Sequence, residues 1–239
     1  MTARALPSPS QARLLALALA AAAGLGAGCG TPRPTAAGGA LTGGWVDLTD
    51  PRHWRSDGGD AFPSGWALED DALTRTADGV GGDLVSRETY GDFELALEWR
   101  VAPCGNSGIF YRGAEGGEAI YNTAPEMQVL DNTCHSDAEV PSHTAGAAYD
   151  LYVPTADATR PAGEWNEVRI LARGAHVEHW LNGVTIVEFE QGSAEWNARV
   201  AASKFVDEPG FGTYMDGLIG LQDHGDLIAF RRIRIRRLD

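Results

Sequence analysis

The stretch Phe93–Val101 alternates strictly, with large apolar residues at every odd position and Glu, Ala, Glu and Arg at the even ones. A period of two places one face of a strand on a core and the other face toward solvent. The segment 165–172 repeats the pattern, with Val168, Ile170 and Ala172 on one face. These patterns predict a chain built largely from half-buried β-strands.

Turn residues indicate how two of the strands are joined. Asn182 and Gly183 separate two runs with strand character, 175–181 and 184–189. The pair Asn-Gly supplies both positive-φ positions of a type I′ turn, whose twist matches that of the flanking strands. The sequence therefore predicts a β-hairpin here.

A second pair of strands is predicted near the end of the chain, at 218–222 and 227–236. In the last strand, the two isoleucines that follow Arg231 and Arg232 are one residue out of phase with the apolar residues before them. A β-bulge near these arginines would return all four apolar side chains to one face, because a bulge inserts one extra residue into a strand.

Helical periodicity is scarce. It is credible only over 194–203, where Ser193 is a suitable N-cap. Many short strands separated by Gly and Asn turns predict an all-β sandwich of two antiparallel sheets. The shorter strands are expected at 45–48, 66–69, 73–76, 84–86, 108–112, 126–130 and 147–152.

The first residues are typical of an export signal. Arg4 and Arg13 precede an apolar run over 14–25 that is too short for a permanent membrane helix. The run leads to Cys29, and the residues before it resemble a bacterial lipobox, although the aliphatic residue stands four places before the cysteine instead of three. An ordinary cleaved signal with an incidental cysteine is the alternative.

We therefore expect an exported protein, acylated at Cys29 and held at the periplasmic side or the cell surface as a lipoprotein. It would meet the membrane only through this lipid. The next residues are rich in Pro, Gly and Ala and suit a flexible tether. The expected organisation is a signal over 1–29, a linker over 30–43 and a β-sandwich domain over 44–239.

The charge of the chain limits its partners. The net charge is −14, and residues 30–239 carry 17 basic and 33 acidic residues, because two arginines belong to the leader. Such a surface repels phosphate backbones and anionic lipid, so nucleic acid is excluded as a partner. A neutral ligand, a cationic ligand or a divalent metal remains compatible.

Two cysteines remain in the predicted domain, Cys104 and Cys134. In an oxidising compartment a disulfide between them is plausible, and two buried free thiols are the alternative. Closing a loop of about 30 residues would stabilise the fold by about 3.5 kcal/mol in the chain-entropy model.

Five short motifs in order along the chain carry a family resemblance. The motifs are GNSGIF (105–110), EMQVLD (126–131), GEWN (163–166), WLNG (180–183) and GLQDHG (220–225). Together with the closing strand 230–235, they resemble the 3-keto-disaccharide hydrolase family, whose members commonly carry Asn in place of Arg232. The resemblance extends from about Gly44 to Leu238.

The resemblance implies a concanavalin A-like jelly roll that acts on glycosides already oxidised to a ketone at C3. It also implies an upstream sugar 3-dehydrogenase that supplies this oxidised sugar. Related members are described as lyase–hydratases, which eliminate across C1–C2 and then add water. A C3 ketone acidifies the C2 hydrogen, so such a site needs a base and an electropositive group for the enolate.

Two strands offer residues for that chemistry. Glu126 and Gln128 share one strand face, about 6.6 Å apart at the usual strand rise, and Gln222 and His224 share another. If the two strands are neighbours, the four side chains converge on one cleft. Glu126 and His224 are then the candidate base and acid, and Gln128 and Gln222 would bind substrate. A solvated strand carboxylate and a simple turn histidine are the alternatives.

Further candidates are less specific. His135 and His143 follow Asp131 in one loop that also carries Asp137, and with a carboxylate they could ligate a divalent metal that polarises the ketone. Their spacing matches no fixed metal motif, and surface histidines are the alternative. Additional candidates for sugar contacts or enolate stabilisation are Asp131, Tyr149, Trp180, Lys204 and Arg112.

Two other functions compete with this hypothesis. A glucanase on the same fold typically alternates three carboxylates on one strand, but the nearest segment has Ala96 in the middle, between Glu94 and Glu98. A lectin-like module that only binds glycans would use the same amides. It would leave the ionisable Glu126 and His224 without a purpose.

Overall fold

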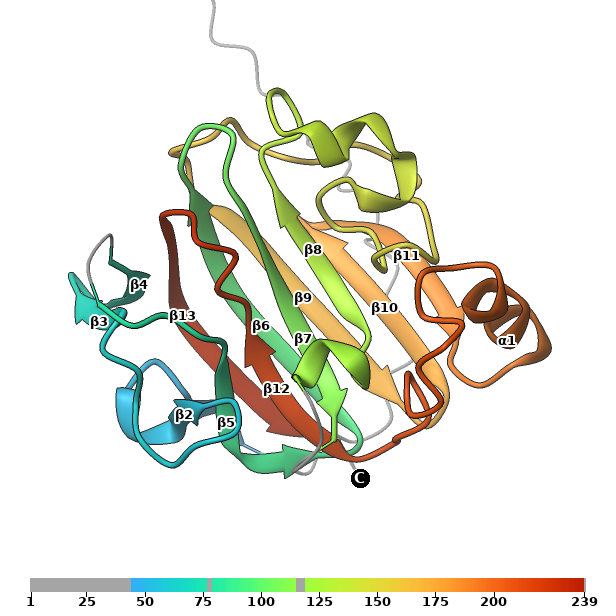
Figure 1. Cartoon of the computed structure of the whole chain (residues 1–239), viewed down its shortest axis with the longest axis horizontal. Coiled ribbons are helices and arrows are strands. Elements are labelled where there is room, and N and C mark those ends of the chain that lie inside the picture. Colours follow the sequence, from blue (N-terminus) through green and yellow to red (C-terminus); the bar gives the residue numbers. More distant parts are fainter. Residues whose placement is uncertain (1–43, 77–78, 115–118, 239) are drawn as a thin grey trace, which may run out of the picture. The chain divides into compact units, whose positions relative to one another are not determined.

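Two antiparallel β-sheets face each other across an apolar core in the computed structural model (Figure 1). Residues 44–76, 79–114 and 119–238 are described, so the predicted leader, Cys29 and the tether lie outside the described residues. The all-β sandwich expected from strand alternation is confirmed.

The first sheet has eight strands in the order β11-β10-β9-β6-β13-β4-β3, and β1 pairs with β13 beside this path. Its strands are β1 (Val46–Asp47), β3 (Trp66–Glu69), β4 (Ala72–Arg75), β6 (Phe93–Val101), β9 (Asn166–Arg173), β10 (His176–Leu181), β11 (Val184–Glu190) and β13 (Ile228–Arg237).

The second sheet has five strands in the order β2-β5-β12-β7-β8. Its strands are β2 (Trp54–Ser56), β5 (Leu84–Tyr90), β7 (Asn106–Gly113), β8 (Glu126–Leu130) and β12 (Gly217–Leu221). The helical segments among the described residues are α1 (Ala194–Ala201) and four 3-10 turns, η1 (Pro51–His53), η2 (Ile120–Asn122), η3 (Ser136–Glu139) and η4 (Pro141–His143).

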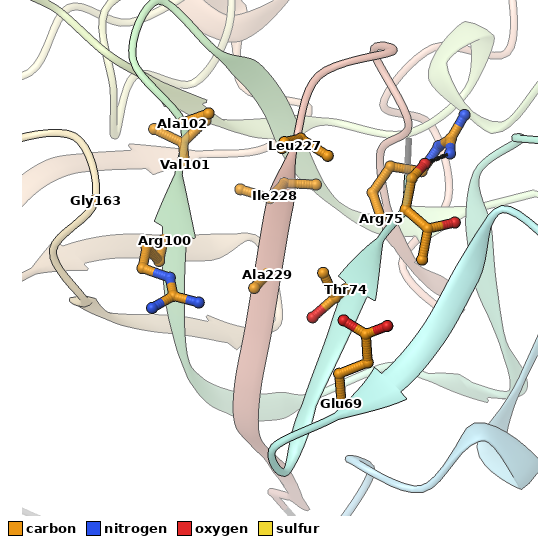
Figure 2. Close-up of a pocket in the computed structure, with 11 residues that line it drawn as sticks. Glu69, Thr74, Arg75, Arg100, Val101, Ala102, Gly163, Leu227, Ile228 and Ala229 are labelled. Atoms are coloured by element: carbon orange, nitrogen blue, oxygen red, sulfur yellow. Dashed lines mark hydrogen bonds between the residues drawn. The ribbon is translucent and has the colours of Figure 1, made fainter. Parts of the chain in front are cut away.

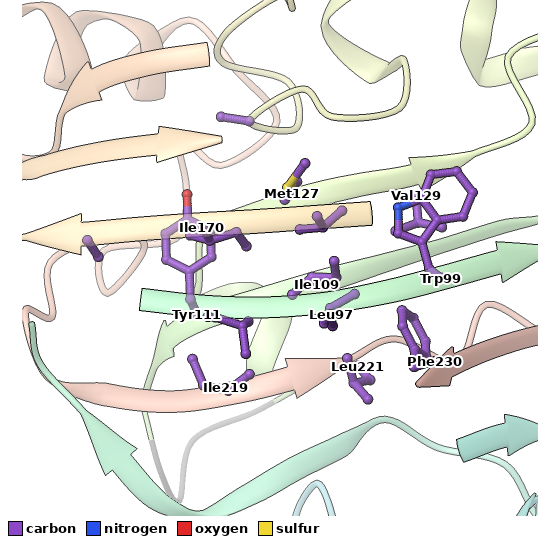
Figure 3. Packing of buried hydrophobic residues seen from close by; sticks show 14 of the residues in the cluster. Leu97, Trp99, Ile109, Tyr111, Met127, Val129, Ile170, Ile219, Leu221 and Phe230 are labelled. Carbon is purple, nitrogen blue, oxygen red and sulfur yellow. The ribbon is translucent and has the colours of Figure 1, made fainter. Parts of the chain in front are cut away.

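The core fills the space between the sheets, as Figure 3 shows. Leu97 and Trp99 of β6 pack toward Ile109 of β7 and Met127 of β8, and each is at most 2% exposed. Burying a large apolar side chain contributes about 1.5–3 kcal/mol. The core therefore fixes which face of β7 and β8 is turned outward.

Three local predictions are confirmed. Asn182 and Gly183 both have positive φ, at 49° and 83°, and join β10 to β11. The register between β13 and β6 shifts between Arg231 and Arg234, where Arg232 has φ 50°, as a bulge requires. Helix α1 begins after Ser193, whose Oγ accepts a hydrogen bond from the backbone N–H of Trp196 at 3.1 Å.

The predicted strand at 147–152 is wrong. Leu151 N and Tyr152 N both donate to Ala148 O at 2.9 Å, and Asp150 has φ 60°. The segment is therefore a tight buried loop with only isolated bridges at Ala148. Its apolar residues are buried because the loop packs on the sandwich, which produces a strand-like pattern without a strand.

The predicted disulfide is confirmed. Cys104 and Cys134 are bonded, with their Cα atoms 4.7 Å apart. The bond joins the segment that leads into β7 to the loop that follows β8.

Among the described residues, no helix is long and apolar enough to span a bilayer.

Candidate active site

Polar side chains gather on the outer face of the five-stranded sheet. Met127 and Val129 of β8 belong to the core, so Glu126 and Gln128 point to the other face. β8 and β12 are not neighbours, because β7 lies between them. A cavity of about 60 Å³ opens there and is lined by Asn106, Glu126, Gln128, Asp137, Tyr149, Lys204, Gln222 and His224.

Gly108 makes the room that Glu126 needs. It lies in β7 directly opposite Gln128, and its carbonyl accepts a hydrogen bond from the backbone N–H of Gln222 at 2.9 Å. A Cβ at this position would lie 2.0 Å from Oε1 of Glu126 and 2.7 Å from its Cδ. The missing side chain of Gly108 therefore lets the carboxyl group lie against the sheet.

The carboxyl of Glu126 is 7% exposed and accepts no hydrogen bond from any described residue. Burial raises the pKa of Glu126 to about 8, which the positive charge of Lys204 opposes and the negative charges of Asp83 and Asp137 reinforce. A carboxyl with a pKa near neutrality can take up or release a proton at working pH, as general acid–base catalysis requires.

Lys204 and Tyr149 form a donor group beside Glu126. Nζ of Lys204 lies 4.1 Å from the centre of the Tyr149 ring, and the His143 ring stacks on the same tyrosine at 4.4 Å. Burial raises the pKa of Tyr149 to about 12, with Asp137, Glu126 and Asp150 adding to it. The phenol is therefore protonated at neutral pH and can donate a hydrogen bond.

Asp150 holds this group in place. One oxygen lies 3.0 Å from Nε2 of His143, and the other accepts a hydrogen bond from the backbone N–H of Lys204 at 2.8 Å. The positive φ of Asp150 turns the chain between Tyr149 and Leu151. Thus one aspartate connects the loop after β8 to the loop after α1.

A buried histidine anchors the same loop from the core side. His179 is fully buried, and its Nδ1 lies 3.0 Å from the carbonyl oxygen of Gly146. A carbonyl only accepts, so Nδ1 donates, and Nε2 accepts from the hydroxyl of Tyr111 at 2.9 Å. Burial lowers the pKa of His179 to about 4, which keeps the ring neutral.

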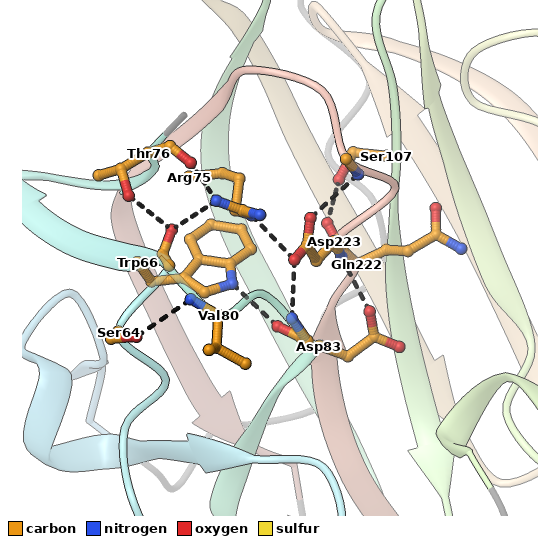
Figure 4. Close-up of polar contacts among 12 residues, drawn as sticks. Ser64, Trp66, Arg75, Thr76, Val80, Asp83, Ser107, Gln222 and Asp223 are labelled. Carbon is orange, nitrogen blue, oxygen red and sulfur yellow. Dashed lines mark hydrogen bonds and ion pairs between the residues drawn. The ribbon is translucent and has the colours of Figure 1, made fainter. Parts of the chain in front are cut away.

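Asp223 precedes His224 in the chain and holds this turn through the contacts that Figure 4 draws. Asp223 pairs with Nε of Arg75 at 2.8 Å and accepts a hydrogen bond from the backbone N–H of Gly82 at 2.7 Å. Its own N–H donates to Asp83 at 2.8 Å, and burial raises the pKa of Asp83 to about 6. His224 itself is exposed at the rim of the cavity.

The predicted metal ligands do not meet in one group. Nδ1 of His135 accepts a hydrogen bond from the backbone N–H of Asp137 at 3.1 Å, and His143 pairs with Asp150. Over residues 44–76, 79–114 and 119–238, the group whose ligand atoms approach closely enough to share a cation is His176, Glu178 and Glu188. It lies on β10 and β11 of the other sheet.

A larger cavity, of about 470 Å³, opens on the outer face of the eight-stranded sheet over β6, β13 and β4 (Figure 2). Its lining includes Glu69, Thr74, Arg75 and Arg100. The carboxyl of Glu69 is exposed, and no unpartnered buried oxygen occurs among the described residues that line this cavity. The chemistry therefore favours the smaller cavity at Glu126.

Residues 44–236 match the family described as the 3-keto-alpha-glucoside-1,2-lyase-like domain. The chain belongs to this family. It is also 36% identical over 229 residues to the 3-keto-disaccharide hydrolase of Bacteroides thetaiotaomicron. The alignment covers 82% of this chain and 79% of that protein.

Solved structures agree with the family. A Parabacteroides distasonis protein assigned as a glycosyl hydrolase is 31% identical with a TM-score of 0.74, over 82% of this chain and 94% of that one. A Bacillus subtilis protein with a galectin-like fold is 14% identical with a TM-score of 0.54, over 83% and 96% of the two chains, and supports the fold alone. This member of the 3-keto-alpha-glucoside-1,2-lyase-like family is a hydrolase of glycosidic bonds on a jelly-roll-like sandwich.

Two predicted site residues of this family member, Arg112 and Trp180, lie elsewhere. Arg112 is fully buried and donates to Gln191 and to backbone carbonyls, so it serves as a structural clamp. Trp180 lies on the other sheet, under the guanidinium of Arg169 at 4.6 Å. Neither residue lines the cavity at Glu126.

Asp131 lies at the end of β8 and holds the following loop. It accepts hydrogen bonds from the backbone N–H of Cys104 at 2.8 Å and from the hydroxyl of Thr133 at 2.7 Å. Burial raises the pKa of Asp131, but these hydrogen bonds outweigh it and leave the pKa below its ordinary value. Its side chain is fully used in holding the loop, and it does not line the cavity.

Two residues of this site are not among the candidates that the sequence indicates for binding or catalysis. Asn106 lies within the first motif, and strand alternation places it on the same face as Gly108. Asp137 belongs to the loop of the predicted metal ligands, but it lines the cavity and accepts a hydrogen bond from Nδ2 of Asn106 at 3.3 Å. The alternation of β7 was the signal that could have revealed Asn106.

Proposed function

We propose that this hydrolase cleaves the glycosidic bond of glycosides already oxidised to a ketone at C3, by elimination followed by hydration. The carboxylate of Glu126 removes the proton from C2. The electron pair of that C–H bond moves toward the ketone, so the C3 oxygen becomes that of an enolate. When the carbonyl re-forms, a C1=C2 double bond forms and the C1–O bond breaks. The leaving alkoxide takes a proton from His224. Water then adds to C1 and a proton returns to C2, so the net reaction is hydrolysis.

The observation that carries this proposal is the Glu126 carboxyl, buried on a polar sheet face with its pKa raised to about 8. A base for a weakly acidic C–H works best when its pKa lies near the working pH. A lectin has no use for such a group, since burying an unpaired carboxyl costs stability and a neutral amide would bind a sugar as well.

Lys204 and Tyr149 supply what the enolate needs. Nζ of Lys204 has no carboxylate partner within 4.0 Å among the described residues, and the hydroxyl of Tyr149 stays protonated at neutral pH. An ammonium and a phenol aimed at a developing oxyanion stabilise it most where water is excluded. Both groups line the same cavity as Glu126.

The test compares a 3-keto-glucoside with its unoxidised parent, each incubated with purified protein in D₂O. We expect cleavage of the ketone only, with deuterium at C2 of the released sugar beyond that in an enzyme-free control. Cleavage of both compounds at similar rates would overturn the ketone requirement. Cleavage of the ketone without deuterium at C2 would replace elimination by direct hydrolysis. Binding without any cleavage would favour the lectin alternative.

We also propose that the chain is a lipoprotein of the periplasmic side or cell surface, anchored through Cys29, and that a sugar 3-dehydrogenase supplies its substrate. The lipobox-like residues before Cys29 support the anchor. Metabolic labelling with palmitate should mark the wild-type protein and leave Cys29→Ala unlabelled. Equal labelling of both would rule out this anchor.

A further inference from the structure

Two buried side-chain oxygens at the site accept no hydrogen bond. Over residues 44–76, 79–114 and 119–238, the buried side-chain oxygens without a hydrogen-bond partner are Oδ1 of Asn106 and Oε1 of Gln222. Both residues line the cavity at Glu126. A buried acceptor left unpaired costs about 1–3 kcal/mol, so the presence of both in one cavity requires an explanation.

The orientation of Asn106 is fixed by its neighbours. The residue is 2% exposed, and its Nδ2 donates to Oδ2 of Asp137 at 3.3 Å. Its backbone N–H donates to Asp226 at 3.0 Å. A carboxylate accepts only from the NH₂ side of the amide, so Oδ1 of Asn106 must be the atom left free.

Gln222 is held by its backbone. Its N–H donates to the carbonyl of Gly108 at 2.9 Å, and its carbonyl accepts from the hydroxyl of Ser107 at 2.7 Å. These bonds attach the residue to β7, the strand that carries Asn106. Gln128 in the same cavity differs, because its Oε1 already accepts from the N–H of Val129 at 3.1 Å.

We propose that Asn106 and Gln222 form an acceptor end of the site that binds two hydroxyl groups of the sugar, and that Lys204 and Tyr149 form the opposing donor end. This assignment rests on the proposed function for the identity of the sugar. A ketone oxygen can only accept hydrogen bonds, so it cannot pair with Oδ1 of Asn106 or Oε1 of Gln222, which both need a donor. Sugar hydroxyls can donate to both oxygens, so the ring enters with its hydroxyls at Asn106 and Gln222 and its C3 carbonyl at Lys204.

The acceptor end also sets selectivity. A ligand without the matching hydroxyl leaves a buried amide oxygen unpaired, and sites of this kind reject such analogues strongly. We expect the loss of one matching hydroxyl to weaken binding about 5- to 100-fold. Loss of a hydroxyl that faces elsewhere should weaken binding far less.

The experiment measures dissociation constants by calorimetry in the Glu126→Gln background, which prevents turnover. The ligands are methyl 3-keto-glucoside, its 4-deoxy and 6-deoxy derivatives, and the unoxidised parent. In the background protein we expect at least one deoxy ligand to bind about 5-fold or more weakly. Addition of Gln222→Met should weaken the full ligand and erase the penalty of the matching deoxy ligand.

Gln222→Glu is the matched control variant, because it keeps an acceptor oxygen in place. It should restore the loss of affinity that the matching deoxy ligand shows in the background protein. Asn106→Leu should erase the penalty of the other hydroxyl, with its melting temperature checked because it also releases Asp137. Unchanged deoxy penalties in both Gln222→Met and Asn106→Leu would overturn the acceptor end. If the penalties are erased as expected but no 3-keto-glycoside is cleaved by the unmodified protein, the proposed function fails and this assignment stands.

Discussion

Gly108→Ala should displace the carboxyl of the proposed base, Glu126, without unfolding the protein. The added methyl would lie 2.0 Å from Oε1 of Glu126, whereas ordinary contacts begin at 3.4 Å. The oxygen must therefore retreat by about 1.4 Å from its native position. It can do so because the side chain end is flexible and the cavity of about 60 Å³ lies beside it.

The expected cost falls on catalysis. A misplacement of about 1 Å can reduce a rate about 100-fold, which corresponds to about 2.7 kcal/mol in the activation barrier. The free energy of unfolding should change little. Replacing a strand glycine by alanine reduces the conformational entropy of the unfolded chain, which stabilises the fold by about 0.5–1 kcal/mol and offsets the crowding near the added methyl. The displaced carboxyl of Glu126 also becomes more hydrated, so its raised pKa should fall.

Two measurements test whether the added methyl displaces Glu126 without unfolding the protein. One is the initial rate on a 3-keto-glucoside across pH, and the other is the melting temperature. Gly220→Ala is the control, since its Cβ would lie 3.0 Å from side-chain atoms of Ile120 and Phe110 and does not approach Glu126. We expect Gly108→Ala to lose activity and keep its melting temperature, and Gly220→Ala to do the reverse. Activity of Gly108→Ala above half of the wild-type value would refute the claim that Glu126 must lie against the sheet.

Three further outcomes follow from the pKa shifts. With Glu126 as the proposed base and its pKa raised to about 8, kcat/KM should rise with pH and level off above about 8. Lys204→Met should move the midpoint upward and Asp137→Asn downward, each by about one pH unit, and an unmoved midpoint in both variants would assign the limb to another group. Folding raises the pKa of Glu126 from 4.5 to about 8, so wild-type stability declines as pH rises through this window. Glu126→Gln should therefore melt about 5 °C or more above wild type at pH 9, and an equal advantage at pH 5 would contradict this. Folding lowers the pKa of His179 from 6.5 to about 4, so the free energy of unfolding should fall by about 3 kcal/mol as pH drops through that window. His179→Gln should flatten that slope in denaturant titrations, and an unchanged slope would show that other groups cause the loss.

The fold was accessible from the sequence wherever burial follows a period of two. The alternation of 93–101, the Asn182-Gly183 turn and the bulge at Arg232 all reflect local geometry, and the structure contains each of them. The segment 147–152 could not be read in this way. Its side chains are buried by contacts with distant residues, such as the stacking of Tyr152 on Phe189 with the ring centres 4.9 Å apart, and a local pattern carries no record of them.

The site was accessible in part. Alternation predicted the outward faces of Glu126 and Gln128, and the family motifs pointed to Gln222 and His224, all of which line one cavity. The free oxygen of Asn106 depends on Asp137, which lies 31 residues away. No pattern in the sequence indicates such a contact, so the acceptor end required the structure.

Trp180 is out of phase with the buried Val177 and Leu181 of β10, so its ring lies on the outward face of that strand. The sequence could not show that this face belongs to the other sheet, where the ring stacks with Arg169. Which sheet a strand joins depends on long-range pairing, and pairing partners leave little local trace. Arg112 lies in the sheet that carries the site, but at the far end of β7, where long-range contacts such as its hydrogen bond to Gln191 bury it.

One comparison tests the central claim most directly, namely that Glu126 serves as the base of a ketone-dependent cleavage. Initial rates are measured for the wild-type chain and for Glu126→Gln, each with a 3-keto-disaccharide and with its unoxidised parent. We expect the wild-type chain to cleave only the ketone, and Glu126→Gln to lose that rate by about 100-fold or more while still binding the sugar. Undiminished turnover by Glu126→Gln, or equal cleavage of the unoxidised parent, would contradict the account.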